Sequence, residues 1–152
     1  MKIGDLAQAT GTDVQTIRFY EREGLLPAPA RSAGNYRLYD ASHVERLTFI
    51  RHCRTLDMAL SEIRELLRFK DAPHANCGEV NALLDEHIEH VALRIRELKA
   101  LQLELKRLRS ACGQTREAQD CGILAELSQP APSLTRASHV EASHPRGRTS
   151  NR

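Results

Sequence analysis

Residues 79–111 constrain the fold of this chain more than any other stretch, because they combine a seven-residue repeat with the absence of Gly and Pro. Steps of three and four residues mark a stripe that is apolar at all but two positions: Leu84, His87, Val91, Arg94, Leu98, Leu101, Leu105, Leu108 and Cys112. Ile88 and Ile95 widen its first half. A long helix with such a stripe needs a partner helix. The pattern predicts a dimerisation helix over 79–112 that forms a coiled coil.

Cysteines flank this helix. Cys77 and Cys112 are 35 residues apart, which is about 52 Å along a helix, so they cannot meet within one chain. In an antiparallel pair of such helices, Cys77 of one subunit would lie near Cys112 of the other. Cys121, in the loop just past Cys112, favours a shared thiol site over the alternative of unrelated buried thiols. Cys53 lies among apolar neighbours in a predicted helix, and we expect it in the core.

Composition limits the classes of protein to which the chain can belong. No stretch reaches the ~18 apolar residues of a membrane span, and the N-terminus has no apolar signal region, so we expect a cytoplasmic protein without membrane contact. Thiols in a reducing compartment serve metal or redox chemistry before disulfides. We do not expect an enzyme, because the sequence has no C-x-x-C pair, phosphate loop or nucleophile–base motif. The net charge of +2 does not by itself indicate nucleic acid.

The first 23 residues predict two short helices joined by a tight turn, over 3–9 and 14–23. Gly11 can end the first helix, and Thr12 or Asp13 can cap the second. Such a pair is a helix-turn-helix, whose second helix meets base edges and phosphates in DNA-binding proteins. Our candidates for this contact face outward near the start of the second helix: Gln15, Thr16 and Arg18. Any two-helix corner looks similar, so this pattern alone leaves DNA binding open.

A small β-wing is predicted over residues 30–39, with its turn at 32–35. Arg and Tyr side chains donate to phosphate oxygens, which suits this segment to clamping a DNA backbone. The phosphate-contact candidates are Tyr20, Arg31, Tyr36 and Arg37. The alternative is a solvated hairpin whose tyrosines pack on the core, as we expect for Tyr39. Helices over 43–56 and 60–70, the former capped by Asp40, complete a DNA-binding domain of residues 1–70, and a linker follows over 71–78.

Several of these segments resemble the N-terminal signature of MerR-family transcription regulators: residues 16–21 (TIRFYE), 24–26 (GLL), 34–39 (GNYRLY) and 46–50 (RLxFI). Others resemble the cadmium/lead-responsive branch of that family (CadR/PbrR type): residues 77–81 (CGEVN), 85–88 (DEHI) and 112–124 (C-x8-CGIL). The resemblance covers residues 1 to about 127. It implies a mainly α fold, with a winged helix-turn-helix head, a homodimer held by a long antiparallel coiled coil, and metal sites at the two ends of that coil.

The resemblance also implies a metal site over residues 112–127, a loop and a short helix. Its ligands would be Cys112, Cys121 and Cys77 of the partner subunit. Thiolates are soft ligands, so they favour Cd(II) or Pb(II), with Hg(II) or Zn(II) possible. Copper-sensing relatives have a serine at the position resembling Cys77, and zinc-sensing relatives carry an adjacent second cysteine and a loop histidine that residues 113–120 lack. A disulfide switch between Cys112 and Cys121 is the redox alternative.

The function implied by the resemblance is activation of a metal-resistance or efflux promoter. The dimer would bind double-stranded DNA between promoter elements that are spaced too widely for RNA polymerase, and metal would bend and untwist that DNA. The alternatives are a mercury- or zinc-responsive regulator and a sensor of an organic ligand, which would normally need a larger C-terminal domain. Residues 128–152 predict a disordered tail. Its His139 and His144 are candidates for an auxiliary metal site.

Overall fold

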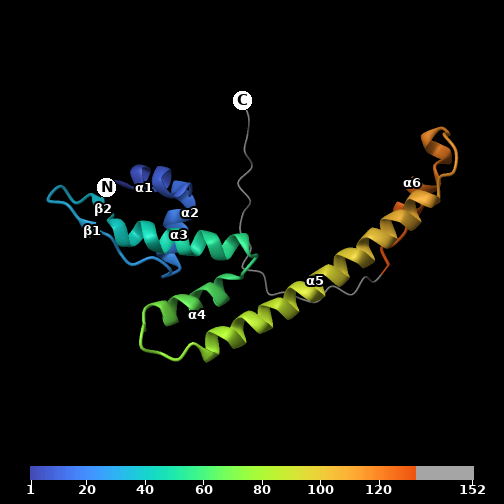
Figure 1. Ribbon diagram of the computed structural model, residues 1–152. Helices are drawn as coiled ribbons and strands as arrows, with labels where there is room; N and C mark the ends of the chain where they lie inside the picture. The colour runs from blue at the N-terminus through green and yellow to red at the C-terminus, as the bar shows by residue number, and fades with distance from the viewer. Residues whose placement is uncertain (133–152) are drawn as a thin grey trace. The chain divides into compact units, whose positions relative to one another are not determined.

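The computed structural model describes residues 1–132, in two units that comprise residues 1–80 and residues 81–132 (Figure 1). The fold is mainly helical, as the sequence predicted. Its elements in order are α1 (Ile3–Thr10), α2 (Val14–Arg22), β1 (Ala30–Arg31), β2 (Arg37–Leu38), α3 (Ala41–Thr55), α4 (Leu60–Lys70), α5 (Gly78–Ser110), the 3-10 helix η1 (Ala118–Asp120) and α6 (Gly122–Leu127). None of the helices in the described part of the chain has the length and apolarity that crossing a membrane requires.

The boundaries of the first three helices follow from local capping. Gly11 ends α1 at a φ of +62°, and the Asp13 carboxylate accepts the Thr16 N–H at 2.8 Å to begin α2. At α3, Asp40 accepts the Ser42 N–H at 2.9 Å, so this helix begins at Ala41, two residues earlier than predicted. Hydrogen bonds from Ser42 and His43 lower the pKa of Asp40 to about 2.

The core of residues 1–80 is built from one apolar side chain or more on each helix of the head and on the segment after α2. Fully buried members are Leu6, Ile17, Leu25, Leu47, Ile50, Ile63 and Leu67. Tyr39 and Cys53 are 2% and 6% exposed and join this core, which confirms the packing role predicted for both. Burial raises the pKa of the Cys53 thiol, which disfavours the thiolate form that binds metals.

The wing is a two-stranded antiparallel sheet in which Ala30 pairs with Leu38, and Arg31 with Arg37. Asn35 takes a φ of +65°, and its N–H donates to the Ser32 carbonyl at 2.9 Å, so the turn lies where it was predicted. The second strand begins at Arg37. The Tyr36 N–H donates to the Ser32 hydroxyl at 3.1 Å, and this turn contact takes the place of a ladder bond.

Gly11→Ala is expected to destabilise the head more than Gly24→Ala, although both glycines have a similar positive φ, +62° and +72°. A Cβ at Gly24 meets no atom within 4 Å, so this variant reports only the left-handed backbone, at about 1 kcal/mol. A Cβ at Gly11 would lie 2.1 Å from Arg51 Nη1, which donates to the Thr10 carbonyl. The Gly11 variant should lose about 2 kcal/mol in urea unfolding. Equal losses would mean that Arg51 moves away freely.

Helix α5 runs without a break for 33 residues, and it begins one residue before the predicted start and ends two residues before the predicted end (Figure 1). Most of its predicted apolar stripe is uncovered in the single chain: Leu84, Ile88, Val91, Ile95, Leu98, Leu101 and Leu105 each expose more than a third of their surface. Exposed leucines and isoleucines in a continuous row on one helix mark an interaction surface. This supports the predicted coiled coil, whose partner helix would come from a second copy.

Candidate metal centre and nucleic-acid interface

The chain after α5 folds back so that two of the three predicted metal ligands meet. Cys112 follows the last turn of α5, and Cys121 occupies the position before Gly122, where α6 begins. The side chain of Cys112 lies near enough to Cys121 to lower the pKa of that thiol, and Cys112 Sγ donates to the Gln114 carbonyl at 3.1 Å. Both cysteines are half-buried. The eight-residue loop between them therefore returns one thiol to the other within a single chain.

The surroundings of Cys121 favour its thiolate form. The backbone N–H groups of Leu124 and Ile123, at the start of α6, lower the pKa of this thiol, and the Cys112 side chain adds to the effect. A lowered pKa increases the thiolate fraction at any given pH, and the thiolate is the form that binds metals. Two adjacent sulfur donors fit a soft metal ion and do not suit Mg(II) or Ca(II), which prefer oxygen.

Of the other predicted metal ligands, the structure describes only Cys77. Cys77 precedes α5 and is exposed, so its thiol is open to a ligand or to a second chain. His139 and His144 lie outside the described residues. The predicted third ligand therefore stays a prediction that depends on the dimer.

On the recognition helix α2, two of the three predicted base-contacting residues are exposed. Gln15 and Arg18 both face solvent. Thr16 is half-buried, and its hydroxyl donates to Asp13 at 2.8 Å, so in this conformation it supports the helix start. The pKa of Asp13 is lowered by these hydrogen bonds, first of all by the one from the Thr16 N–H.

In the wing, the predicted phosphate contacts are exposed. Tyr36 is 68% exposed, and Arg31 donates to the Asn35 carbonyl at 3.0 Å. Arg37 approaches Glu21 of α2 at 3.8 Å, and the Tyr39 hydroxyl donates to the same carboxylate. Burial, and then the bond to Glu21, raises the pKa of Tyr39 to about 12, so it remains a donor at neutral pH. Glu21 thereby joins the wing to the recognition helix, a link that the sequence pattern did not predict.

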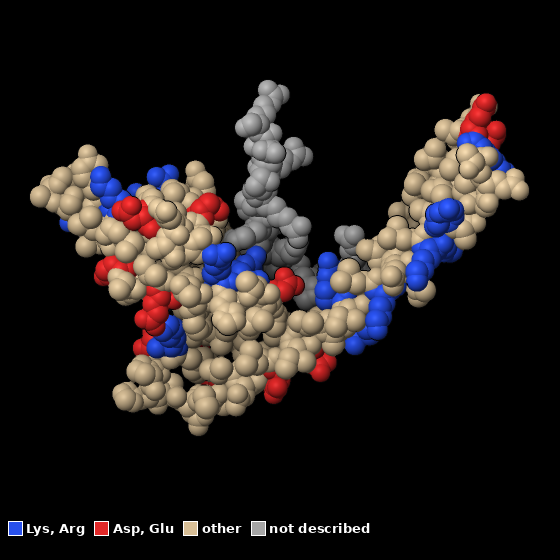
Figure 2. All heavy atoms as spheres, turned by 45° about the horizontal axis from the view of Figure 1, so that its top comes forward, with Lys and Arg blue, Asp and Glu red and all other residues tan. Residues whose placement is uncertain are grey.

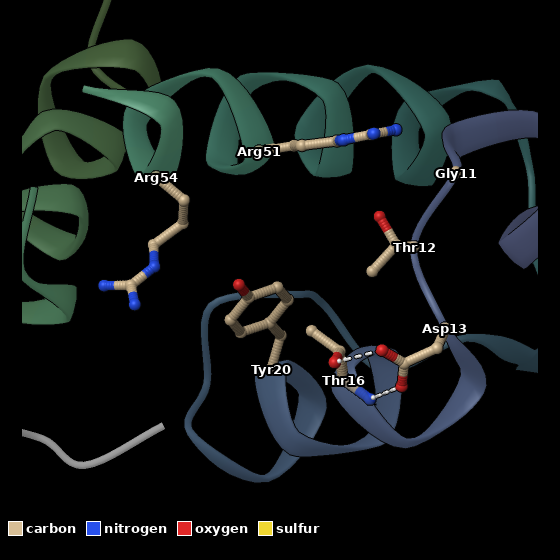
Figure 3. Close-up of a pocket in the computed structure, with 7 residues that line it drawn as sticks. All are labelled: Gly11, Thr12, Asp13, Thr16, Tyr20, Arg51 and Arg54. Carbon is tan, nitrogen blue, oxygen red and sulfur yellow. Dashed lines mark hydrogen bonds between the residues drawn. The ribbon is translucent and has the colours of Figure 1, made fainter. Parts of the chain in front are cut away.

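A pocket of about 220 Å³ opens beside the start of α2, as Figure 3 shows. Its lining residues come from the α1–α2 turn, from α2 and from α3: Gly11, Thr12, Asp13, Thr16, Tyr20, Arg51 and Arg54. Tyr20 was predicted to contact phosphate as an exposed side chain, and the structure shows that it is buried instead. This residue is 4% exposed because its ring packs in the core, so only its hydroxyl is available to the pocket. Burial raises the pKa of this hydroxyl.

Sequence reasoning missed the two arginines of this pocket. Arg51 donates to the Thr10 carbonyl at 2.5 Å and Arg54 to the Met58 carbonyl at 2.9 Å, so both guanidinium groups are held in place by backbone oxygens. The available signal was their spacing: residues three apart lie on the same face of a helix. The sequence alone did not show that this face of α3 lies beside the recognition helix α2.

Charge pairing separates the cations of the head into two groups. Acidic and basic side chains are interspersed on it in Figure 2, and five basic residues pair with carboxylates: Arg37, Arg46, Arg64, Arg68 and Lys70. Within residues 1–132, no carboxylate pairs with Arg18, Arg31, Arg51 or Arg54. An arginine without a carboxylate partner keeps its charge available for a phosphate. Arg18 lies on α2 and Arg31 on the wing, where DNA contact was predicted. Arg51 and Arg54 line the pocket beside α2.

Comparison with known proteins agrees with this architecture. The family model described as MerR HTH family regulatory protein matches residues 1–70, and the one described as MerR, DNA binding, matches residues 44–108. The HTH-type transcriptional regulator ZntR homolog of Haemophilus influenzae is 50% identical over 109 residues, which are 72% of this chain and 81% of the relative. The mercuric resistance operon regulatory protein of Bacillus cereus is 35% identical over 126 residues, 83% and 96% of the two chains.

A solved structure is similar over almost its whole length. The crystal structure of the transcription regulator PbrR691 from Ralstonia metallidurans CH34, in complex with lead(II), shares 55% sequence identity with this chain at a TM-score of 0.74. The match covers 84% of this chain and 99% of that one. These similar proteins are regulators and not enzymes. The fold, the family models and the relatives together show that the chain belongs to the MerR family of helix-turn-helix regulatory proteins.

Proposed function

We propose that this protein is a transcriptional activator that responds to a divalent soft metal, Cd(II) or Pb(II), and controls a metal-resistance or efflux promoter. The observation that carries the proposal is the pair of half-buried thiols, Cys112 and Cys121, in contact at the end of a dimerisation helix. A metal-responsive regulator needs a site whose occupancy changes the geometry of its dimer. Cys112 and Cys121, beside the apolar stripe of α5, supply two of the three donors of such a site.

The third donor is Cys77 of the partner subunit. An antiparallel pair of α5 helices brings the start of one helix to the end of the other, and Cys77 lies one residue before α5. Three thiolates around a divalent ion carry a formal charge of −1, which is much easier to bury than three separate negative charges. A site made by both chains responds to dimer geometry, so the ion can favour one arrangement of the two heads.

The choice of metal rests on the donor set and on the relatives. PbrR691 was crystallised in complex with lead(II), at 55% identity, whereas the two relatives described above are named as a ZntR homolog and as a mercuric resistance operon regulatory protein. Zinc sites in proteins usually have four N or S ligands, and the loop over 113–120 has no histidine to supply the fourth. This favours Cd(II) or Pb(II). A mercury- or zinc-responsive regulator is the second candidate, because three thiolates also bind Hg(II), and Zn(II) can add water.

On the DNA side, each recognition helix would enter a major groove of promoter DNA and each wing would contact the backbone. Gln15 and Arg18 would face the bases, and Arg31, Tyr36 and Arg37 the phosphates. The pocket between α2 and α3 would take a further phosphate on Arg54 and the Tyr20 hydroxyl. RNA polymerase would start transcription once the metal-loaded dimer distorts its over-long promoter spacer, a distortion that costs a few kcal/mol.

Arg54→Gln should weaken DNA binding about tenfold at moderate salt and lower the slope of log affinity against log salt by about one, because one phosphate contact is lost. Fluorescence anisotropy with the operator at several salt concentrations measures both quantities. Arg68→Gln is the matched control: it removes the same charge from a side chain that already pairs with Glu65 at 3.0 Å. If the two variants bound DNA equally well, the pocket would not be a phosphate site.

The proposed function is tested by transcription in vitro from the protein's own promoter, with Cd(II), Pb(II), Hg(II), Zn(II) and Cu(I) titrated separately at buffered free concentrations. Activation at the lowest free concentration by Cd(II) or Pb(II) is the expected result. Activation led by Hg(II) or Zn(II) would support the second candidate. A response to none of the five would reject metal sensing altogether.

A further inference from the structure

Helix α6 is tied to the last turns of α5 by one arginine that bridges two carboxylates. Arg107 on α5 donates through Nε to Glu104 at 3.0 Å and through Nη2 to Glu104 at 2.5 Å. The same Nη2 lies 2.6 Å from Oε1 of Glu126, which belongs to α6. The two carboxylates raise the pKa of Arg107, and Glu104 contributes first. Glu104 thus orients the guanidinium group, which then binds Glu126.

A second contact holds the other end of α6. A Cβ at Gly122 would lie 2.5 Å from the Ala111 carbonyl oxygen, so the backbone at the start of α6 rests directly on the chain at the end of α5. Gly122 follows Cys121, and Ala111 precedes Cys112. The backbone contact at Gly122 and the ion pair at Glu126 therefore bracket α6, and the first of them adjoins both thiols.

We propose that Arg107 is a positioning residue for the metal site: by binding Glu126 it keeps α6 docked on α5, so that Cys112 and Cys121 are paired before metal arrives. The inference rests on the proposed function. A loop that is already ordered loses less conformational entropy on binding, and this raises affinity without adding a ligand. The contact is solvent-accessible, since the side chains of Arg107 and Glu126 are 52% and 37% exposed. Its expected effect is therefore moderate, roughly threefold to tenfold in metal affinity.

The experiment compares Arg107→Gln, Glu126→Gln and the double variant with the wild-type protein, all as full-length chains. Lys106→Gln is the matched control, because it removes the same charge from the neighbouring exposed residue, which has no ion pair within residues 1–132. Cd(II) affinity is measured from the thiolate-to-metal charge-transfer absorbance in competition with a chelator. Amide hydrogen exchange of the metal-free protein reports α6 itself, through the N–H groups of Ala125 and Ser128, which donate to Cys121 and Leu124 at 3.1 and 3.2 Å.

The expected result is a threefold to tenfold loss of Cd(II) affinity and faster exchange across α6 in both single variants. The double variant should bind Cd(II) with no lower affinity than the single variant that binds it less tightly, because both substitutions remove the same ion pair. Lys106→Gln should behave like wild type. The proposal is overturned if Arg107→Gln matches Lys106→Gln in affinity, whether or not its α6 exchanges faster.

Failure of the proposed function would look different. A wild-type protein without any thiolate–Cd(II) absorbance would contradict the three-cysteine site and, with it, the positioning role of Arg107. A wild-type protein that binds Cd(II) through its cysteines, beside an Arg107→Gln variant of equal affinity, would reject only the positioning role.

Discussion

Replacing Cys112 with serine is expected to abolish metal-dependent activation and to leave operator binding by the metal-free protein unchanged. Cys112 contacts Cys121 and lies at the end of α5, whereas the residues expected to contact DNA all belong to the head. A serine hydroxyl is a harder ligand that stays protonated near neutral pH, so a soft ion would lose one of three donors. We expect a loss of Cd(II) affinity of roughly 100-fold or more. Transcription at buffered free Cd(II), with a gel-shift assay of the metal-free protein, measures both effects.

Cys53→Ala provides the matched cysteine control. Cys53 is 6% exposed in the core of the head, and burial raises the pKa of its thiol, so it has neither the access nor the charge state of a metal ligand. This variant should lose some stability and keep its metal response. Persistent induction in Cys112→Ser would mean that the thiol pair is not the sensor. Induction by an organic effector in that variant would point to the alternative class of ligand.

Sequence predicted those parts of the fold that depend on neighbours close along the chain. Asp40 caps α3, Asp13 is the one of two candidates that caps α2, Gly11 ends α1, and the turn at 32–35 makes the wing, each because the residue satisfies the local backbone. The prediction that Cys112 and Cys121 share one site came instead from the family resemblance, because an eight-residue loop alone would allow them to lie about 30 Å apart. Helix α5 was predictable because a stripe that is regular over nine positions fits few structures other than a long helix.

Features that depend on distant segments were not predictable in this way. The pocket joins Tyr20 of α2 to Arg54 of α3, and nothing in either local pattern says that they meet. Tyr20 looked like a surface donor in an Arg-rich helix, yet its ring fills the core, because the helix must bury one face. Arg107 and Glu126 are 19 positions apart across an irregular loop, so helical spacing cannot predict that they pair.

Leu101→Glu is expected to dissociate the dimer and to remove operator binding at nanomolar protein. Leu101 lies in the middle of the apolar stripe and exposes 40% of its surface in the single chain, so a partner helix would bury it. A glutamate there would lose the packing of a leucine, about 2–5 kcal/mol, and would bring a charge into an apolar seam. Because a two-fold symmetric interface contains the substituted residue twice, the dimer dissociation constant should rise more than 1000-fold. Analytical ultracentrifugation measures it directly.

Leu103→Glu is a stringent control, because it makes the same substitution two residues further along the same helix. Leu103 lies off the stripe and is 67% exposed, so its replacement should leave the dimer intact. If Leu101→Glu remained dimeric, or if both variants dissociated alike, the stripe would not be the interface.

The two variants also test the metal site, because Cys77 of the partner subunit can complete the Cys112–Cys121 pair only within a dimer. Leu101→Glu should therefore lose high-affinity Cd(II) binding although its own cysteines are unchanged, whereas Leu103→Glu should keep it.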